Sequence, residues 1–226
     1  MIHQPDISTY YDQLAPHYDE DRFANSYGQY IHEQETAILD KLLPHPPTDS
    51  TLDLGCGTGR LLKWASHGLD SSPMMLEEAR RKYPEHHLSK APAWDTPYLR
   101  YSFSAVYAFH LLMHLERAQV TKVFQEAARI IKPGGRFIFD IPSTNRRQLT
   151  GHQADNWHAA QSMTLADIAA IDPQTWKIQS YQGVLFMPIH RIPARWRSSL
   201  LWADNLLCRS PWRSYASYLV VELVRL

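Results

Sequence analysis

The fold of this chain is decided by the stretch Leu52-Asp53-Leu54-Gly55-Cys56-Gly57-Thr58-Gly59-Arg60. A short apolar strand runs there directly into a turn with three glycines at alternating positions. Glycine lets the backbone turn sharply and lets a ligand approach it closely. In α/β proteins, such a turn at the carboxyl edge of the sheet is where nucleotides bind. The stretch therefore predicts a nucleotide-type ligand site built largely from backbone.

The details of this motif argue against a pyrophosphate as the ligand. The dinucleotide fingerprint is G-x-G-x-x-G, whereas here the third glycine comes one position early and Arg60 stands in the place of the last glycine. Asp53 precedes the first glycine by two positions. A carboxylate repels a pyrophosphate and attracts a cation, so the motif favours a ligand that carries positive charge.

Strands and helices alternate along the chain around this motif. The spacing of apolar residues predicts strands over 51–54, 67–70, 86–89, 103–108, 136–141, 176–187 and 216–225, and helices over 8–20, 27–43, 73–82, 116–131, 165–171 and 193–208. Pro16 is expected to end or kink the first helix. A stiff linker, Pro44-His45-Pro46-Pro47, is expected after the second. The alternation predicts an α/β fold whose mostly parallel sheet carries helices on both faces.

The composition is that of an ordinary globular protein and limits its partners. The chain has 226 residues, with 23 basic and 23 acidic side chains and a formal net charge of zero. This balance argues against nucleic acid, which favours a basic face. The two cysteines, Cys56 and Cys208, are too few for a disulfide framework or a zinc ligand set. Because neither a signal peptide nor a membrane-spanning run of about 18 apolar residues is found, we expect a soluble cytoplasmic protein.

Four motifs, in this order, resemble those of the class I S-adenosylmethionine-dependent methyltransferases. They are Tyr10-Tyr11-Asp12-Gln13-Leu14-Ala15-Pro16-His17-Tyr18-Asp19, the D-x-G-x-G-x-G string at 53–59, Gly68-Leu69-Asp70-Ser71-Ser72-Pro73-Met74-Met75-Leu76, and Lys132-Pro133-Gly134-Gly135-Arg136-Phe137. The resemblance covers residues 8–142. It implies a Rossmann-like sheet of seven strands, mainly parallel with an antiparallel last strand. It also implies methyl transfer from S-adenosylmethionine to a small-molecule acceptor.

The resemblance implies a role for each matched residue. Asp70 would bind both ribose hydroxyls of the cofactor, a strong charge-assisted contact. Tyr11 and Tyr18 would cover the cofactor as a lid, and His110 and His114 become the catalytic candidates, one of them as a general base. The full set of expected cofactor contacts is Tyr11, Tyr18, Asp53, Gly55, Cys56, Gly57, Gly59, Arg60, Asp70, Ser71, Met75, Ala93, Trp94 and Phe109. We expect a single domain over 1–226, with a helical lid at 1–47, a cofactor-binding half at 48–142 and a substrate-side half at 143–226.

Two departures from the family pattern have structural consequences. Gly59 and Asp70 are only 11 positions apart, whereas the acidic residue usually follows the glycine turn by about 20. The helix between them should therefore be only one or two turns long. Pro92 stands where the family often has an acidic residue that recognises the adenine amino group, so adenine contact would fall to Ala93 and Trp94.

Other interpretations remain open at this point. His110 and His114 have the i, i+4 spacing of metal ligands on a helix, but no third ligand accompanies them and we expect no metal. The segment 195–202 is rich in Arg, Trp and Leu; it could dock weakly on a membrane surface or pack onto its own domain. A nicotinamide or flavin oxidoreductase is disfavoured by the early third glycine. A protein that binds the cofactor without catalysis is favoured by Pro92 and the short first helix.

Overall fold

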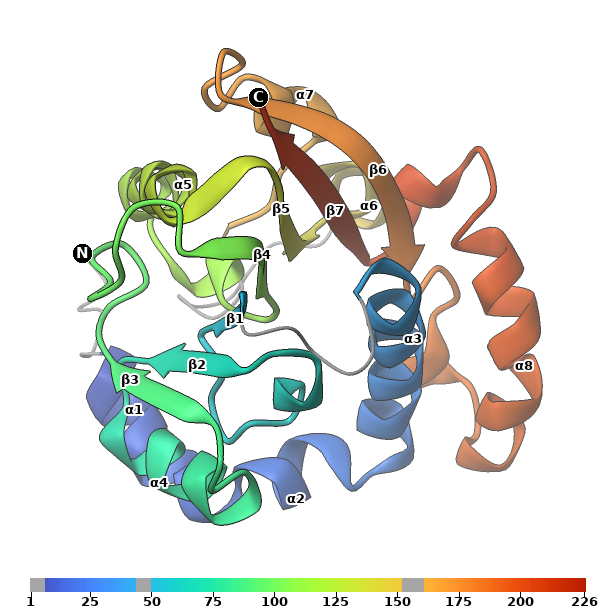
Figure 1. Ribbon diagram of the computed structural model, residues 1–226. Helices are drawn as coiled ribbons and strands as arrows, with labels where there is room; N and C mark the ends of the chain where they lie inside the picture. Colours follow the sequence, from blue (N-terminus) through green and yellow to red (C-terminus); the bar gives the residue numbers. More distant parts are fainter. Residues whose placement is uncertain (1–6, 44–49, 152–160) are drawn as a thin grey trace, which may run out of the picture.

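The computed structural model of the protein describes residues 7–43, 50–151 and 161–226. Within them, seven strands form one sheet in the order β3-β2-β1-β4-β5-β7-β6 (Figure 1). The strands are β1 (Thr51–Leu54), β2 (His67–Asp70), β3 (His87–Lys90), β4 (Phe103–Ala108), β5 (Ile131–Pro142), β6 (Trp176–Val184) and β7 (Tyr218–Arg225). β7 runs antiparallel to both of its neighbours. The predicted seven-stranded, mainly parallel sheet with an antiparallel last strand is confirmed.

Alternate residues of the central strands build a separate core on each face of the sheet. In β4, Val106 and Ala108 join the core under α5, whereas Ala105 and Tyr107 join the core under α3. This is the period of two that a strand imposes on its side chains. Because the order reverses between β1 and β4, the carboxyl ends of these two strands border a crevice, the usual ligand position in open α/β sheets.

The helices cover both faces of the sheet. Their bounds are α1 (Ile7–Leu14), α2 (Tyr18–Phe23), α3 (Ser26–Leu42), α4 (Pro73–Lys82), α5 (Arg117–Ile130), α6 (Thr144–Thr150), α7 (Leu165–Ala169) and α8 (Ala194–Leu207), with 3-10 turns at η1 (Ala15–His17), η2 (Leu62–Trp64), η3 (Leu112–His114), η4 (Ile189–Arg191) and η5 (Arg213–Tyr215). No described helix combines the length and the apolar character needed to cross a bilayer.

Most predicted elements are found within two residues of their predicted ends, and the exceptions have local causes. The helix expected over 8–20 is broken by the 3-10 turn η1, because Pro16 cannot continue the hydrogen-bond pattern of α1. The strand expected over 136–141 already begins at Ile131 in β5, and the strand expected over 176–187 ends at Val184 in β6. α6 was not predicted; Ser143 caps it by accepting a hydrogen bond from the backbone NH of Arg146. The linker predicted at 44–47 lies outside the described residues.

The junction of α2 and α3 depends on Gly28. A Cβ atom at this position would lie 2.0 Å from the carbonyl oxygen of Arg22 and 2.6 Å from Cα of Phe23. Both neighbours are backbone atoms, so they cannot rotate away. Glycine at this position is therefore what lets α2 lie against α3.

We expect Gly28→Ala to lower the free energy of unfolding by about 1–3 kcal/mol, as overpacking does. Alanine would gain up to about 1 kcal/mol of helix propensity, but the backbone clash should outweigh that gain. Urea denaturation measures the difference. Glu33→Ala, at an exposed position of the same helix, is the matched control and should stay within about 0.5 kcal/mol of the wild type. A Gly28→Ala protein as stable as wild type would contradict this reading of the junction.

Candidate functional site

A cavity of about 270 Å³ lies where the sequence motifs meet. It is bordered by the glycine loop, the ends of β1, β2 and β4, and the N-terminal helices. Apart from Gly59, all of the predicted site residues line it. The unpredicted lining residues are Ile7, Ser8, Phe23, Thr58, Leu61, Leu69, Ala91, Pro92, Leu111 and Leu115.

The glycine loop presents open backbone to the cavity. Gly55 and Gly57 have φ angles of +81° and +52°, which side-chain-bearing residues rarely adopt. A Cβ on Gly57 would meet no atom within 4 Å, so this residue faces free space. Gly59 instead packs against α4, because its Cβ would touch the side chains of Tyr83 and Ala79. The prediction that Gly59 lines the site is therefore not reproduced by the cavity; its role is to allow close packing behind the loop.

Asp70 holds the loop and faces the cavity at the same time. Its Oδ2 accepts a hydrogen bond of 2.9 Å from the backbone NH of Gly57, and its Oδ1 accepts one of 2.8 Å from the backbone NH of Ser72. Burial raises the pKa of Asp70, although these hydrogen bonds favour the carboxylate. The helix cap of α4 is Ser72, so Asp70 is not needed for that task. Its carboxylate can accept further hydrogen bonds from a ligand.

Asp53 is a second buried carboxyl group at the cavity wall. Its side chain is almost entirely enclosed, and burial raises its pKa to about 8. The charge of Asp70 also raises this pKa, and the charge of Arg60 opposes the shift. Asp53 is therefore mainly protonated near neutral pH and would ionise if a cation were placed beside it.

The opposite end of the cavity is apolar and is held in place by α5. Ala93, Trp94 and Met75 line this end. The loop that carries them is fixed by Glu126, whose Oε1 accepts hydrogen bonds from the backbone NH and hydroxyl of Thr96 at 2.8 and 2.5 Å. Pro92 lies in the wall, so no carboxylate stands at that position.

The N-terminal helices cover the cavity and are pinned by two aspartates. Tyr11 and Tyr18 line it, with their rings 6.0 Å apart in an edge-to-face arrangement. Asp12 accepts a hydrogen bond of 2.5 Å from the Ser72 hydroxyl. Asp19 accepts one of 2.6 Å from the Thr58 hydroxyl. The two anchors join the helices to the N-cap of α4 and to the glycine loop, as a lid would require.

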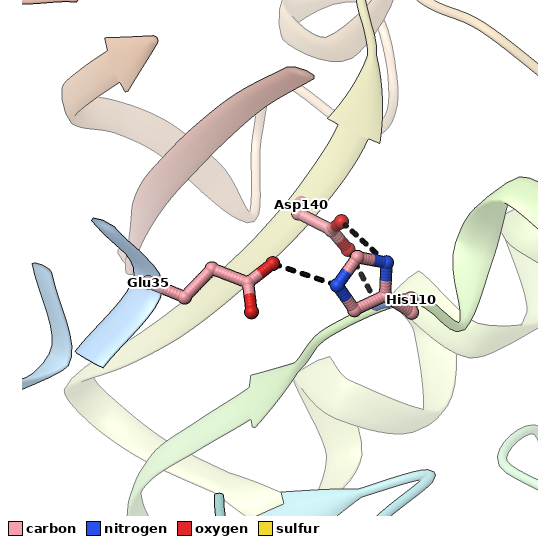
Figure 2. A group of neighbouring side chains, drawn as sticks. All are labelled: Glu35, His110 and Asp140. Atoms are coloured by element: carbon pink, nitrogen blue, oxygen red, sulfur yellow. Dashed lines mark hydrogen bonds and ion pairs between the residues drawn. The ribbon is translucent and has the colours of Figure 1, made fainter. Parts of the chain in front are cut away.

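A charged cluster adjoins the cavity through His110 and Arg60, which line it; Figure 2 shows its members Glu35, His110 and Asp140. The imidazole of His110 sits between two buried carboxylates, with Nε2 2.7 Å from Glu35 Oε1 and Nδ1 3.6 Å from Asp140 Oδ2. The second oxygen of Glu35 lies 2.7 Å from a guanidinium nitrogen of Arg60. The backbone NH of His110 also donates to Asp140 Oδ1 at 2.6 Å. Four segments far apart in sequence therefore meet in one ion-pair network.

The protonation states in this cluster follow from its contacts. Burial acts to raise the pKa of Glu35, but His110 and Arg60 outweigh it and lower that pKa to about 2. Burial acts to lower the pKa of His110, but Glu35 and Asp140 raise it above its ordinary value. Burial raises the pKa of Asp140 to about 6. The two carboxylates therefore favour the protonated form of His110.

The metal interpretation of His110 and His114 requires one helix, and the structure does not provide it. His110 has a φ of +55° and precedes η3, whereas His114 ends η3. Glu35, His110 and Asp140 have ligand atoms within 4.8 Å of one another. The ring, however, points its two nitrogens at different carboxylates (Figure 2), and Arg60 occupies the second oxygen of Glu35. The arrangement is that of an ion-pair network.

Sequence reasoning did not find Glu35 or Asp140. Both lie in ordinary positions of an apolar pattern, Glu35 on the inner face of α3 and Asp140 within the strand Phe137–Ile141. Their charge was the signal that could have identified them. An ionisable residue on the buried face of a helix or strand needs a partner. Only the fold shows that the shared partner is His110.

Comparisons with known proteins agree with this geometry. The family described as "Methyltransferase domain" matches residues 52–139. The chain is 29% identical over 147 residues to an uncharacterized methyltransferase, YodH, of Bacillus subtilis, covering 54% of this chain and 61% of that protein. The chain thus spans less than two thirds of that relative.

Solved structures show the same fold at low identity. A S-adenosylmethionine-dependent methyltransferase of Thermotoga maritima, described as a possible histamine N-methyltransferase, superimposes with a TM-score of 0.67 and 17% identity, over 96% of this chain and 98% of that one. Geranyl diphosphate C-methyltransferase of Streptomyces coelicolor, in complex with S-adenosyl-L-homocysteine, gives a TM-score of 0.59 at 18% identity, over 85% of this chain and 76% of that one. Residues 52–139 therefore match a methyltransferase domain, and the chain as a whole has the Rossmann-like fold of these solved S-adenosylmethionine-dependent methyltransferases.

Proposed function

We propose that this chain binds S-adenosylmethionine in the cavity and transfers its methyl group to a small-molecule acceptor. The observation that carries the proposal is that an open glycine loop and the Asp70 carboxylate, which are joined by a hydrogen bond, line the same cavity. A small acceptor fits a site covered by α1 and α2 and a chain with no net charge. The solved structures that resemble this chain support the fold on which the proposal depends.

The residues present fit this cofactor along the whole cavity. The free space at Gly57 accepts a ligand against backbone. Asp53 offers a carboxyl group to an ammonium, and Asp70 offers acceptors to two hydroxyls. The apolar end formed by Ala93, Trp94 and Met75 suits a purine ring. When bound, the cofactor supplies an electrophilic methyl group on a sulfonium.

The protein itself would align the acceptor with the methyl group and exclude water from the cavity. Tyr11 and Tyr18 close the cavity from the lid side, which desolvates the reacting groups. Holding the acceptor in line with the methyl group lowers the entropic part of the barrier. The anchors at Asp12 and Asp19 keep the lid over the loop during this step.

The two histidines differ in what they can do with a proton. Glu35 and Asp140 favour the protonated form of His110, and that form cannot take a proton from an acceptor. We assign it a positioning role, in which it fixes the turn after β4 beside the methyl position. His114 also lines the cavity, with its ring 6.0 Å from that of Tyr11. His114 is therefore the candidate general base.

Asp70→Asn should weaken binding of S-adenosylhomocysteine by roughly 10- to 150-fold, the value of hydrogen bonds to a charged group. Isothermal titration calorimetry gives the affinity. Asp95→Asn, an exposed neighbour of the adenine-side loop, is the matched control and should bind like wild type. Failure of the wild-type protein to bind would remove the proposed function, and unchanged binding by Asp70→Asn would remove the role of Asp70.

Cofactor binding should release about one proton per site at pH 7, because a cation beside Asp53 lowers a pKa that starts at about 8. Calorimetry in buffers of different ionisation enthalpy measures this release. It should vanish well above pH 8, where Asp53 is already ionised.

Two controls isolate Asp53 as the source of the proton. 5′-Methylthioadenosine lacks the amino-acid part and should release none. Asp53→Asn should also release none with the full cofactor. Release that persists in Asp53→Asn would show that another group titrates.

Glu35→Gln should lower the pKa of His110 and reduce the free energy of unfolding by about 3–5 kcal/mol, because it leaves a buried cation without its anion. The loss should be greatest between pH 4.5 and 6.5, the ordinary values of Glu35 and His110. It should shrink above this window, as pH rises through the raised pKa of folded His110 and the imidazole loses its charge. It should also shrink below it, as Glu35 becomes protonated toward pH 2.

Histidine NMR titration and urea unfolding across pH test this sign. Glu77→Gln, at an exposed ion pair, is the control and should change neither quantity. If the pKa of His110 stays the same in Glu35→Gln, Glu35 does not stabilise the protonated form of His110.

A further inference from the structure

Helix α8 is attached to the rest of the molecule through one face. Asp204 is fully buried, and its Oδ2 accepts a hydrogen bond of 3.0 Å from Gln34 of α3. Its Oδ1 accepts one of 2.6 Å from the backbone NH of Met187. Arg197 donates at 2.9 Å to the hydroxyl of Ser26. This face of α8 is therefore fixed on α3 by specific polar contacts.

The opposite face of α8 carries large apolar side chains into solvent. We call it the outer stripe; its residues are Arg195, Ser199, Trp202, Leu206 and Arg209. The first four lie in α8, where spacings of four, three and four positions place them on one side of the helix; Arg209 is an exposed residue of the turn that follows α8. Trp202 and Leu206 are 68% and 61% exposed. A folded domain normally buries most of a tryptophan.

Two further exposed tryptophans lie beside the outer stripe. Trp196, in the first turn of α8, is 55% exposed, and Trp212, five residues beyond the helix, is 69% exposed. Clustered exposed apolar side chains mark interaction sites on soluble domains. Figure 1 shows α8 at the margin of the molecule, outside α3, with no described element over its outer side. The apolar side chains therefore remain available to a partner.

The charge around the outer stripe is of one sign. Residues 185–217 contain five arginines, Arg191, Arg195, Arg197, Arg209 and Arg213, and a single acidic residue, Asp204. Because Asp204 is buried against α3, the exposed side of this region is basic. This local excess stands out in a chain whose formal net charge is zero.

We propose that the outer stripe of α8 docks onto lipid bilayers that carry anionic headgroups. Tryptophan is the side chain that sits best at the boundary between headgroups and acyl chains. Arginine binds phosphate groups through two parallel hydrogen bonds, and Arg195 and Arg209 stand at the two ends of the stripe. The helix would lie in the plane of the interface. A protein partner would need an acidic surface to pair with these arginines, whereas an anionic bilayer supplies both the phosphate groups and the apolar layer.

The proposal is independent of the proposed function, because it needs neither the cavity nor a bound cofactor. The docking proposal concerns attachment of the protein to a membrane, whereas the proposed function concerns binding of a cofactor in the cavity. The stripe faces away from α3, whose inner face carries Glu35 to the charged cluster beside the cavity. The same variants can therefore be tested for both properties separately.

Vesicle flotation of the full chain tests the proposal. The protein should float with vesicles of phosphatidylcholine mixed with phosphatidylglycerol and should not float with phosphatidylcholine alone. Trp202→Ser with Leu206→Ser should weaken binding by about tenfold or more. Arg195→Ala with Arg209→Ala should weaken it by about 30-fold, and added salt should reproduce that loss. Tryptophan fluorescence should shift to shorter wavelength in the wild type on binding.

Matched controls separate docking from folding and from cofactor binding. Leu99→Ser removes the most exposed large apolar side chain among the described residues, which lies outside the stripe, and should float like wild type. All variants should keep the wild-type melting temperature and the wild-type affinity for S-adenosylhomocysteine. Absence of flotation by the wild type, or equal losses in Leu99→Ser, would overturn the proposal. So would a dimer in light scattering that Trp202→Ser dissociates, because the stripe would then be an interface between two copies.

Discussion

The architecture of the cavity depends on how β2 holds the glycine loop. The backbone NH groups of Gly55 and Cys56 both donate to the carbonyl of Leu69, at 2.7 and 3.0 Å, and that of Gly57 donates to Asp70. A loop of glycines has high conformational entropy when free. These contacts to one strand end convert it into a fixed wall. The same carboxylate that fixes the wall is then available to a ligand.

The N-terminal helices are anchored to the glycine loop and to the turn that follows β2. Asp12 reaches Ser72, which caps α4, and Asp19 reaches Thr58 within the loop. The lid helices are therefore anchored to the parts of the chain that shape the cavity. A change in the loop would be transmitted directly to the lid. This explains why a Tyr-Asp pair occurs twice in the N-terminal segment, at Tyr11-Asp12 and Tyr18-Asp19: each tyrosine lines the cavity, and each aspartate anchors its helix.

Much of the fold and of the cofactor side could be predicted from the sequence, because those features are local. The helix at 73–82 was predicted with its observed ends, since Ser72 and Pro73 are strong start signals. The glycine loop and Asp70 carry a pattern that is readable within 20 residues. Glu35 and Asp140 could not be predicted, because their roles arise only where α3 and β5 meet β4. Gly59 is not among the residues that line the cavity, and its contacts with α4 show that a motif position can also serve packing.

The short spacing between Gly59 and Asp70 explains why the charged cluster exists. The segment after the loop forms only the 3-10 turn η2, and α3 packs against it. Leu39 of α3 and Leu62 of η2 belong to one buried cluster, and the indole NH of Trp64 donates to Asp40 at 2.9 Å. This packing of α3 brings Glu35 against Arg60. The short segment is therefore covered by α3, which also supplies the anion that contacts His110 beside the cavity.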